Sequence, residues 1–236
     1  MEEAQTTHDE AVDGTTKITA KIQEGLLERF DQDMRGCFLK RDAFLNQVIG
    51  SEIPYLRQDL QGKRLTSIAR TYISGKLKRM GTRPVNIVVD KQVAADLNAA
   101  VEAHNLVRDA FINYLLVCLR STPRFLKYFE LPSHYTGSHF DAALEPTEVS
   151  PLRAIASTMC DPFYYLREAV RERHGTGLYA LSMPEEFHGV SCFLADEEVP
   201  GSEANKVLVR ETDALLAALD LDDLEEVAFT PKGNAR

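Results

Sequence analysis

The chain has 236 residues, of which 44% are hydrophobic and 27% are charged, and its formal net charge at pH 7 is −9. This hydrophobic content can fill a core and excludes an intrinsically disordered protein. No apolar run approaches the roughly 20 residues that span a bilayer. The N-terminus, with 5 acids and no Lys or Arg in residues 1–16, predicts that no signal or transit peptide is present. Four widely spaced cysteines are expected to be reduced thiols of a cytoplasmic protein.

The charge is distributed unevenly along the chain. Residues 17–120 hold 17 Lys and Arg against 11 Asp and Glu, whereas residues 121–236 hold 10 against 20. A basic segment inside an acidic protein favours a local site for a polyanion. The alternative is an ordinary protein with an uneven surface charge.

The sequence contains an internal repeat. Residues 39–46 read Leu-Lys-Arg-Asp-Ala-Phe-Leu-Asn and residues 106–113 read Leu-Val-Arg-Asp-Ala-Phe-Ile-Asn, so six of eight positions are identical at an offset of 67. The same offset aligns apolar positions upstream without a gap. A duplication of this kind restricts the fold more than any single motif does.

In the first copy, residues 1–16 are predicted to be a flexible acidic arm. Alternation of polar and apolar residues predicts a strand over 17–22. An amphipathic helix is expected over 24–35, broken by Gly36, and a second over 39–53, ended by Pro54. The apolar positions of this second helix that are expected to point inward are Leu39, Ala43, Phe44, Val48 and Ile49.

The second copy repeats this order, with a strand over 85–89, Asp90 as N-cap of a helix that runs to Ala103, and another helix over 106–119. The two copies are joined by a basic linker, 57–83, in which residues 64–79 predict an amphipathic helix. Residues 122–236 are predicted to be an acidic, helical accessory region. Its helices are expected over 162–173 and 205–226, with an exposed loop over 193–204.

The two predicted strands are expected to pair with each other. A lone strand leaves backbone amides and carbonyls without partners, which is costly when one face is buried. Pairing residues 17–22 antiparallel with 84–89 gives a two-stranded ribbon whose apolar face covers four helices. Lys17, Thr19, Lys21, Asn86 and Val88 are then expected on the outer face.

Strand, helix and helix, with Gly between the helices and an Arg-Asp-Ala-Phe opening to the second, resemble the ribbon-helix-helix DNA-binding family. The resemblance covers residues 17–56 and 84–121. It implies a mainly α fold in which one chain forms a tandem, intramolecular pseudo-dimer over residues 17–121. Similar tandems occur among plasmid conjugation proteins and regulators from bacteria or mobile elements.

By this resemblance, outward strand residues read DNA bases in the major groove. These are Lys17, Thr19 and Lys21 on the first strand and Asn86 and Val88 on the second, where Pro84 begins the strand. Because the two strands differ, the site read should be asymmetric.

The resemblance also implies that each second helix grips a phosphate at its N-terminus. Lys40, Arg41 and Arg108 lie there, although Arg41 and Arg108 have alternative partners in Asp42 and Asp109. The basic linker helix is a further candidate for phosphate contact or, equally, a solvated helix face. Its candidate residues are Lys63, Arg64, Arg70, Lys76, Lys78 and Arg79.

No motif for catalysis, a metal or a cofactor emerges. The spacing of His134 and His139 is compatible with metal binding but lacks a further nearby ligand, and Cys160 near His174 is no protease signature. The chain has no phosphate-binding loop, dinucleotide fingerprint or nucleophile elbow. We expect neither an enzyme nor a cofactor-dependent protein.

The sequence therefore predicts a cytoplasmic, nucleoid-associated regulator of transcription that binds double-stranded DNA. The accessory region is expected to serve in oligomerisation or partner contact, so that adjacent units bind DNA cooperatively, with no membrane contact. Its acidic C-terminal helix is expected to pack on its own domain, with docking to RNA polymerase, another regulator or a second copy as the alternative. Alternative functions are a DNA-bending accessory protein of conjugation, an antitoxin, or a helical interaction scaffold that binds no DNA.

Overall fold

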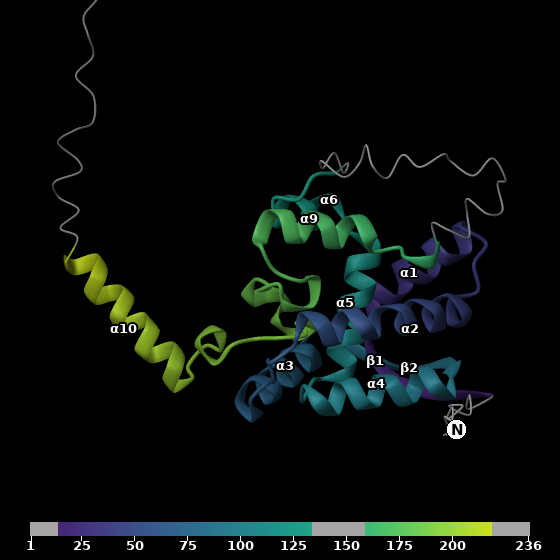
Figure 1. Ribbon diagram of the computed structural model, residues 1–236, viewed down its shortest axis with the longest axis horizontal. Helices are drawn as coiled ribbons and strands as arrows, with labels where there is room; N and C mark the ends of the chain where they lie inside the picture. The colour runs from purple at the N-terminus through teal and green to yellow at the C-terminus, as the bar shows by residue number, and fades with distance from the viewer. Residues whose placement is uncertain (1–13, 134–158, 219–236) are drawn as a thin grey trace, which may run out of the picture. The chain divides into compact units, whose positions relative to one another are not determined.

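The computed structural model describes residues 14–133 and 159–218 (Figure 1). The chain divides into two compact units, Met1–Leu194 and Ala195–Arg236, and each is considered separately. The described part is mainly helical and contains one two-stranded antiparallel sheet. The expected arm, 1–16, and the expected helix over 205–226 extend partly outside the described residues. His134 and His139 lie wholly outside them.

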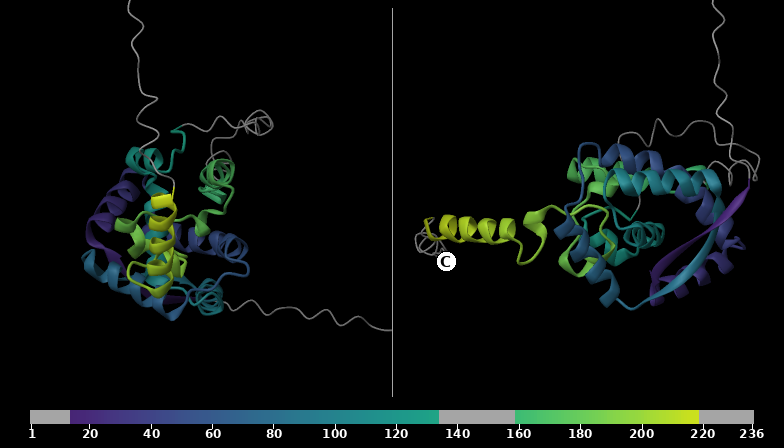
Figure 2. Two further views of the ribbon diagram at one scale, coloured as in Figure 1. Left: turned by 90° about the vertical axis from the view of Figure 1, so that its left-hand side faces the viewer. Right: turned by 90° about the horizontal axis from the view of Figure 1, so that it is seen from below.

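The sheet pairs β1 (Thr15–Gln23) with β2 (Thr82–Asp90). Thr19 lies opposite Asn86, Lys17 opposite Val88 and Lys21 opposite Pro84. The expected antiparallel pairing of the two repeats is thus confirmed. Figure 2 (right) shows the two strands running side by side as a twisted ribbon. The apolar face of this ribbon is buried at Ile18, Ala20, Ile22, Ile87 and Val89.

The two copies have matching structures as well as matching sequences. β2 begins and ends 67 residues after β1, and α4 (Lys91–Ala103) is displaced from α1 (Glu24–Gly36) by the same number. After each helix comes a residue in the left-handed region, Phe38 with φ 58° and Asn105 with φ 55°. Gly36, which was expected to break the first helix, is its last residue.

The second helices of the copies are α2 (Arg41–Asp59) and α5 (Arg108–Arg120). Each packs on the other copy: α5 contacts β1 and α1, and α2 contacts β2 and α4. The core between these elements is formed by apolar side chains that are almost fully buried. Among them are Leu27, Phe30, Leu45, Val48, Ile49, Leu97, Phe111, Ile112 and Leu115. The copies thus share one core and do not form two separate ones.

The prediction that Pro54 ends the second helix is wrong. α2 continues through Pro54 to Asp59. Proline inside a helix removes one backbone hydrogen bond and costs about 3 kcal/mol. Burial of apolar side chains beyond it, at roughly 1.5–3 kcal/mol each, offsets this cost, because Leu56 and Leu60 have no exposed surface.

The expected inward face of α2 also needs correction. Ala43 is exposed and Leu39 and Phe44 are half-buried, whereas Leu45 is 1% exposed. Val48 and Ile49 are buried as expected. Leu45 was not predicted to point inward. Its burial results from the packing of α2 on β2 and α4, which are remote in sequence.

The first unit contains further described helices outside the repeats. The linker forms α3 (Ser67–Arg79), and beyond the second copy lie α6 (Pro123–Tyr128) and α9 (Tyr164–His174). Two short 3-10 turns follow, η1 (Leu178–Ala180) against α2 and η2 (Glu185–Val190) against α3 and α5. The described residues between 122 and 194 therefore belong to the same unit as the repeats.

The second unit contains η3 (Asp196–Glu198) and α10 (Glu203–Ala218). Several apolar side chains of α10 are exposed: Val207, Leu208, Val209 and Leu215. Within the described ranges, no helix has both the length and the apolar composition to cross a bilayer.

A buried ionic network joins α9 to α2. Arg167 Nη1 lies 2.8 Å from Glu52 Oε1, and Arg167 also pairs with Asp161 and stacks over the ring of Tyr55. The hydroxyl of Tyr179 donates to Glu52 Oε2 at 2.6 Å. Burial raises the pKa of Glu52 against the opposing effects of Tyr179 and Arg167. Burial alone would lower the pKa of Arg167, but Glu52 and Asp161 outweigh it and raise that pKa.

We expect Arg167→Ala to lower the free energy of unfolding by about 3–5 kcal/mol, because it leaves the buried Glu52 carboxylate without its cation. Arg171→Ala on the same helix removes an exposed partner of Glu168 and should cost about 0–1 kcal/mol. Urea denaturation followed by circular dichroism measures both variants. If the two variants lost equal free energy of unfolding, the buried network would not be what holds α9 in place.

Candidate nucleic-acid interface

The outer face of the ribbon carries the side chains predicted to read bases. Lys17, Thr19, Lys21 and Asn86 are exposed, and Val88 is half-buried. The antiparallel register places a lysine and an apolar residue at each end of this face, Lys17 with Val88 and Lys21 with Pro84. Both lysines belong to β1, so the two long sides of the ribbon differ in chemistry.

The centre of the face is a polar pair. Thr19 Oγ1 donates to Asn86 Oδ1 at 2.8 Å across the ribbon. The amide oxygen of asparagine has two acceptor sites, and its NH₂ group has two donors. Asn86 therefore keeps hydrogen-bonding capacity on the outer face while Thr19 fixes its orientation.

Arg41 and Arg108, the predicted phosphate contacts, each reach across to the strand of the other copy. Arg41 Nη2 donates to the backbone oxygen of Asn86 at 3.3 Å, and Arg108 Nη2 donates to that of Thr19 at 2.9 Å. Arg41 also pairs with Asp42 through Nε at 2.8 Å, which is the alternative that its sequence neighbour suggested. The two guanidinium groups thus lie beside the central pair of the ribbon, where Asp42 partly neutralises the charge of Arg41.

A second pair of equivalent residues, Asn46 and Asn113, fixes the end of each strand. Asn46 Oδ1 accepts from the backbone amide of Asp90, and Asn113 Oδ1 accepts from that of Gln23, at 2.8 and 2.9 Å. Asn113 Nδ2 also donates to the backbone oxygen of Lys21. The sequence alone did not predict a role for these asparagines. The available signal was a polar residue identical in both copies on the mostly apolar second helix.

The N-cap residues of α2 and α5 are Lys40 and Val107, and neither caps its helix with a side-chain hydrogen bond. Lys40 is exposed at the start of α2. Asp42 Oδ2 accepts from the backbone amide of Val88, so this first turn is tied to the ribbon. The N-terminus of α2 thus lies beside β2.

The basic residues of the linker fall into two groups. Three make tertiary contacts: Lys63 lies over the ring of Phe193, Arg70 donates to Asn105 Oδ1, and Lys76 pairs with Glu185 at 2.9 Å. The hydrogen bond with Glu185 raises the pKa of Lys76, and the same contact lowers the pKa of Glu185. The other three, Arg64, Lys78 and Arg79, are exposed. Three of the six candidate residues are thus engaged by other parts of the first unit.

Among the described residues, no group of three or more His, Cys, Asp or Glu side chains is arranged to hold a metal ion. No protein-family model, curated protein or solved structure matches the chain.

We expect Asn113→Ala to lower the free energy of unfolding by about 1–3 kcal/mol, because the amide of Gln23 and the carbonyl of Lys21 lose a buried partner. The equivalent change, Asn46→Ala, acts at an exposed contact with Asp90 and should cost about 0.5–1.5 kcal/mol. Chemical denaturation compares the two. A larger loss for Asn46→Ala would contradict the assigned contacts.

Proposed function

We propose that the chain is a sequence-specific DNA-binding regulator of transcription, a tandem ribbon-helix-helix protein whose single ribbon enters the major groove. The observation that carries the proposal is the exposed ribbon face, with Lys17, Lys21 and the Thr19–Asn86 pair on it. A two-stranded ribbon is narrow enough for the major groove, where base edges present distinct hydrogen-bonding patterns.

The side chains on this face suit base recognition. Lysine donates to guanine O6 and N7, asparagine pairs with an adenine edge, and a threonine or valine methyl packs on thymine. On the β1 side the face offers Lys17, Thr19 and Lys21, and on the β2 side it offers Asn86 and Val88. The bound site is therefore asymmetric in sequence, although the backbone that binds it is nearly two-fold symmetric.

Arg41 and Arg108 provide the electrostatic part of the proposal. Each lies at the start of a second helix and next to the ribbon, where both the guanidinium and the helix N-terminus attract a phosphate. Lys40 adds a further exposed charge at the first of these positions. The exposed linker residues Arg64, Lys78 and Arg79 are candidates for additional backbone contacts.

The test starts with selection of bound duplexes from a random-sequence DNA library, followed by fluorescence anisotropy on the selected duplex. Lys17→Ala/Thr19→Ala/Lys21→Ala should weaken binding at least tenfold, because each base contact contributes about 1–3 kcal/mol. The free energy of unfolding should barely change, since these side chains are exposed. The logarithm of the affinity should fall with the logarithm of salt concentration by roughly 0.9 per phosphate contacted.

A matched control removes two positive charges elsewhere, in Lys127→Ala/Arg171→Ala on the exposed surfaces of α6 and α9. It should retain the affinity and the selected sequence. The proposal is overturned if the wild-type protein selects no sequence, or if the triple variant and the control bind the selected duplex equally well.

A further inference from the structure

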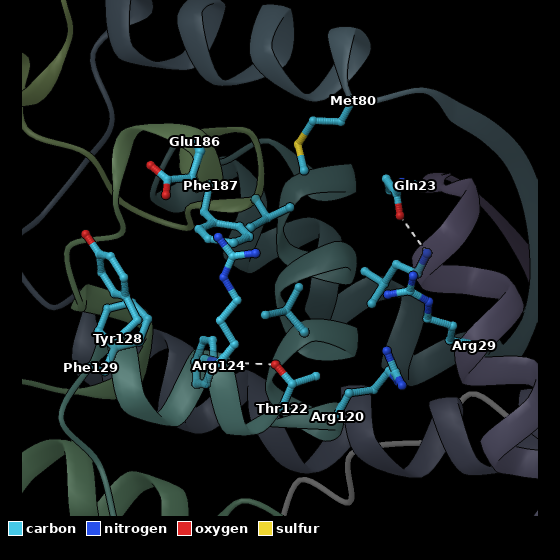
Figure 3. A pocket seen from close by; sticks show the side chains of 14 residues that line it. Gln23, Arg29, Met80, Arg120, Thr122, Arg124, Tyr128, Phe129, Glu186 and Phe187 are labelled. Atoms are coloured by element: carbon cyan, nitrogen blue, oxygen red, sulfur yellow. Dashed lines mark hydrogen bonds between the residues drawn. The ribbon is translucent and has the colours of Figure 1, made fainter.

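A cavity of about 330 Å³ lies beside the end of the ribbon, within the first unit (Figure 3). It is lined from α1, α5, α6 and η2, and by Gln23 at the end of β1 and Met80 just before β2. Its size falls at the lower end of the range of small-molecule sites. The base-reading side chains take no part in it.

The floor of the cavity is apolar. Val190 is fully buried, and Phe125 and Phe129 are 9% and 5% exposed. Leu26 and Val117 add aliphatic surface. Such a floor binds the apolar body of a ligand by removing its surface from water.

Three arginines line the same cavity, Arg29 from α1, Arg120 from the end of α5 and Arg124 from α6. Arg120 pairs with Asp33 at 2.8 Å. For Arg29 and Arg124 the structure gives no ion pair with any described residue. In Figure 3 the Arg124 side chain extends toward Phe187. Glu186 is the only acidic residue among the described residues that line the cavity, so its lining is positive in a protein whose net charge is −9.

We propose that this cavity binds a small amphipathic anion, an aromatic or aliphatic carboxylate or sulfonate whose apolar body lies on the floor and whose charged group pairs with Arg29 or Arg124. Planar guanidinium groups match the geometry of such oxyanions. The small volume favours a metabolite-sized ligand over a peptide segment.

The position of the cavity connects it to the ribbon. Gln23 Oε1 accepts from the backbone amide of Leu26, and the backbone amide of Glu24 donates to the carbonyl of Gly81. These bonds close the end of the ribbon next to the cavity. A ligand that contacts Gln23 therefore touches the segment that sets the relative position of β1 and β2. The site itself does not depend on DNA binding.

The probe for the test is 8-anilinonaphthalene-1-sulfonate, titrated by fluorescence and by calorimetry in the absence of DNA. The wild-type protein should bind one equivalent. Arg29→Gln/Arg124→Gln should weaken binding about tenfold or more, because charged hydrogen bonds to the sulfonate are lost. N-phenyl-1-naphthylamine, a neutral analogue, should be insensitive to this change.

The matched control is Arg171→Gln/Arg173→Gln, which removes the same charge at exposed positions outside the cavity and should leave the affinity unchanged. All the substituted arginines are solvent-exposed, so the variants should fold, and circular dichroism verifies this. The proposal is overturned by the absence of stoichiometric binding, by equal affinities in the two double variants, or by an equal effect on the neutral analogue. A failure of DNA binding would not affect any of these measurements.

Discussion

The antiparallel pairing of β1 with β2 is the interaction on which the rest of the structure depends. Each strand alone would bury one apolar face and leave its backbone donors and acceptors without partners on both edges. The two strands occupy matching positions in copies separated by 67 residues, so the pairing brings the copies together face to face. All four helices of the copies must then cover the same side of the ribbon, because only one side is apolar.

The polar contacts around the ribbon make the two copies interdependent. Arg41 and Asn46 of the first copy bind the backbone of β2, and Arg108 and Asn113 of the second bind that of β1. Each strand is therefore held in place by the second helix of the other copy. Neither copy has the partners to complete its own strand, which explains why the repeats form one core and not a chain of independent units.

The sequence was sufficient to predict the ribbon, its outer face and the order of the helices, because alternation and helical periodicity are local properties. It was insufficient where tertiary contacts decide the outcome. Pro54 is a local stop signal, but burial of Leu56 and Leu60 carries α2 beyond it. Arg70 and Lys76 were predicted either to contact phosphate or to lie on a solvated helix face, and the sequence did not show that Asn105 and Glu185, far away along the chain, bond to them.

The cavity and the Glu52–Arg167 pair were missed for the same reason. Glu52 and Arg167 are separated by 115 residues, and neither residue has a sequence signature of burial. The arginines around the cavity come from three different helices. Only the repeated asparagines carried a usable signal, since an identical polar residue in two apolar helices implies a shared structural role.

The backbones of the two copies match at the strands and first helices, but the surroundings of their second helices differ. Ala43 is exposed and Phe44 half-buried, while the equivalent Ala110 and Phe111 are fully buried. The difference arises because Tyr179 of η1 packs against Phe111, and η2 packs against α5.

The loops before the second helices diverge in the same way: Phe38 is 96% exposed, whereas Asn105 bonds to Arg70 and to the carbonyl of Leu65. In a homodimer the two halves cannot differ in sequence in this way, because every substitution appears in both subunits. Joining the copies in one chain removes that constraint. The two copies can then make different contacts with the linker and with α9, η1 and η2, while the ribbon retains two different strands, with both outward lysines on β1.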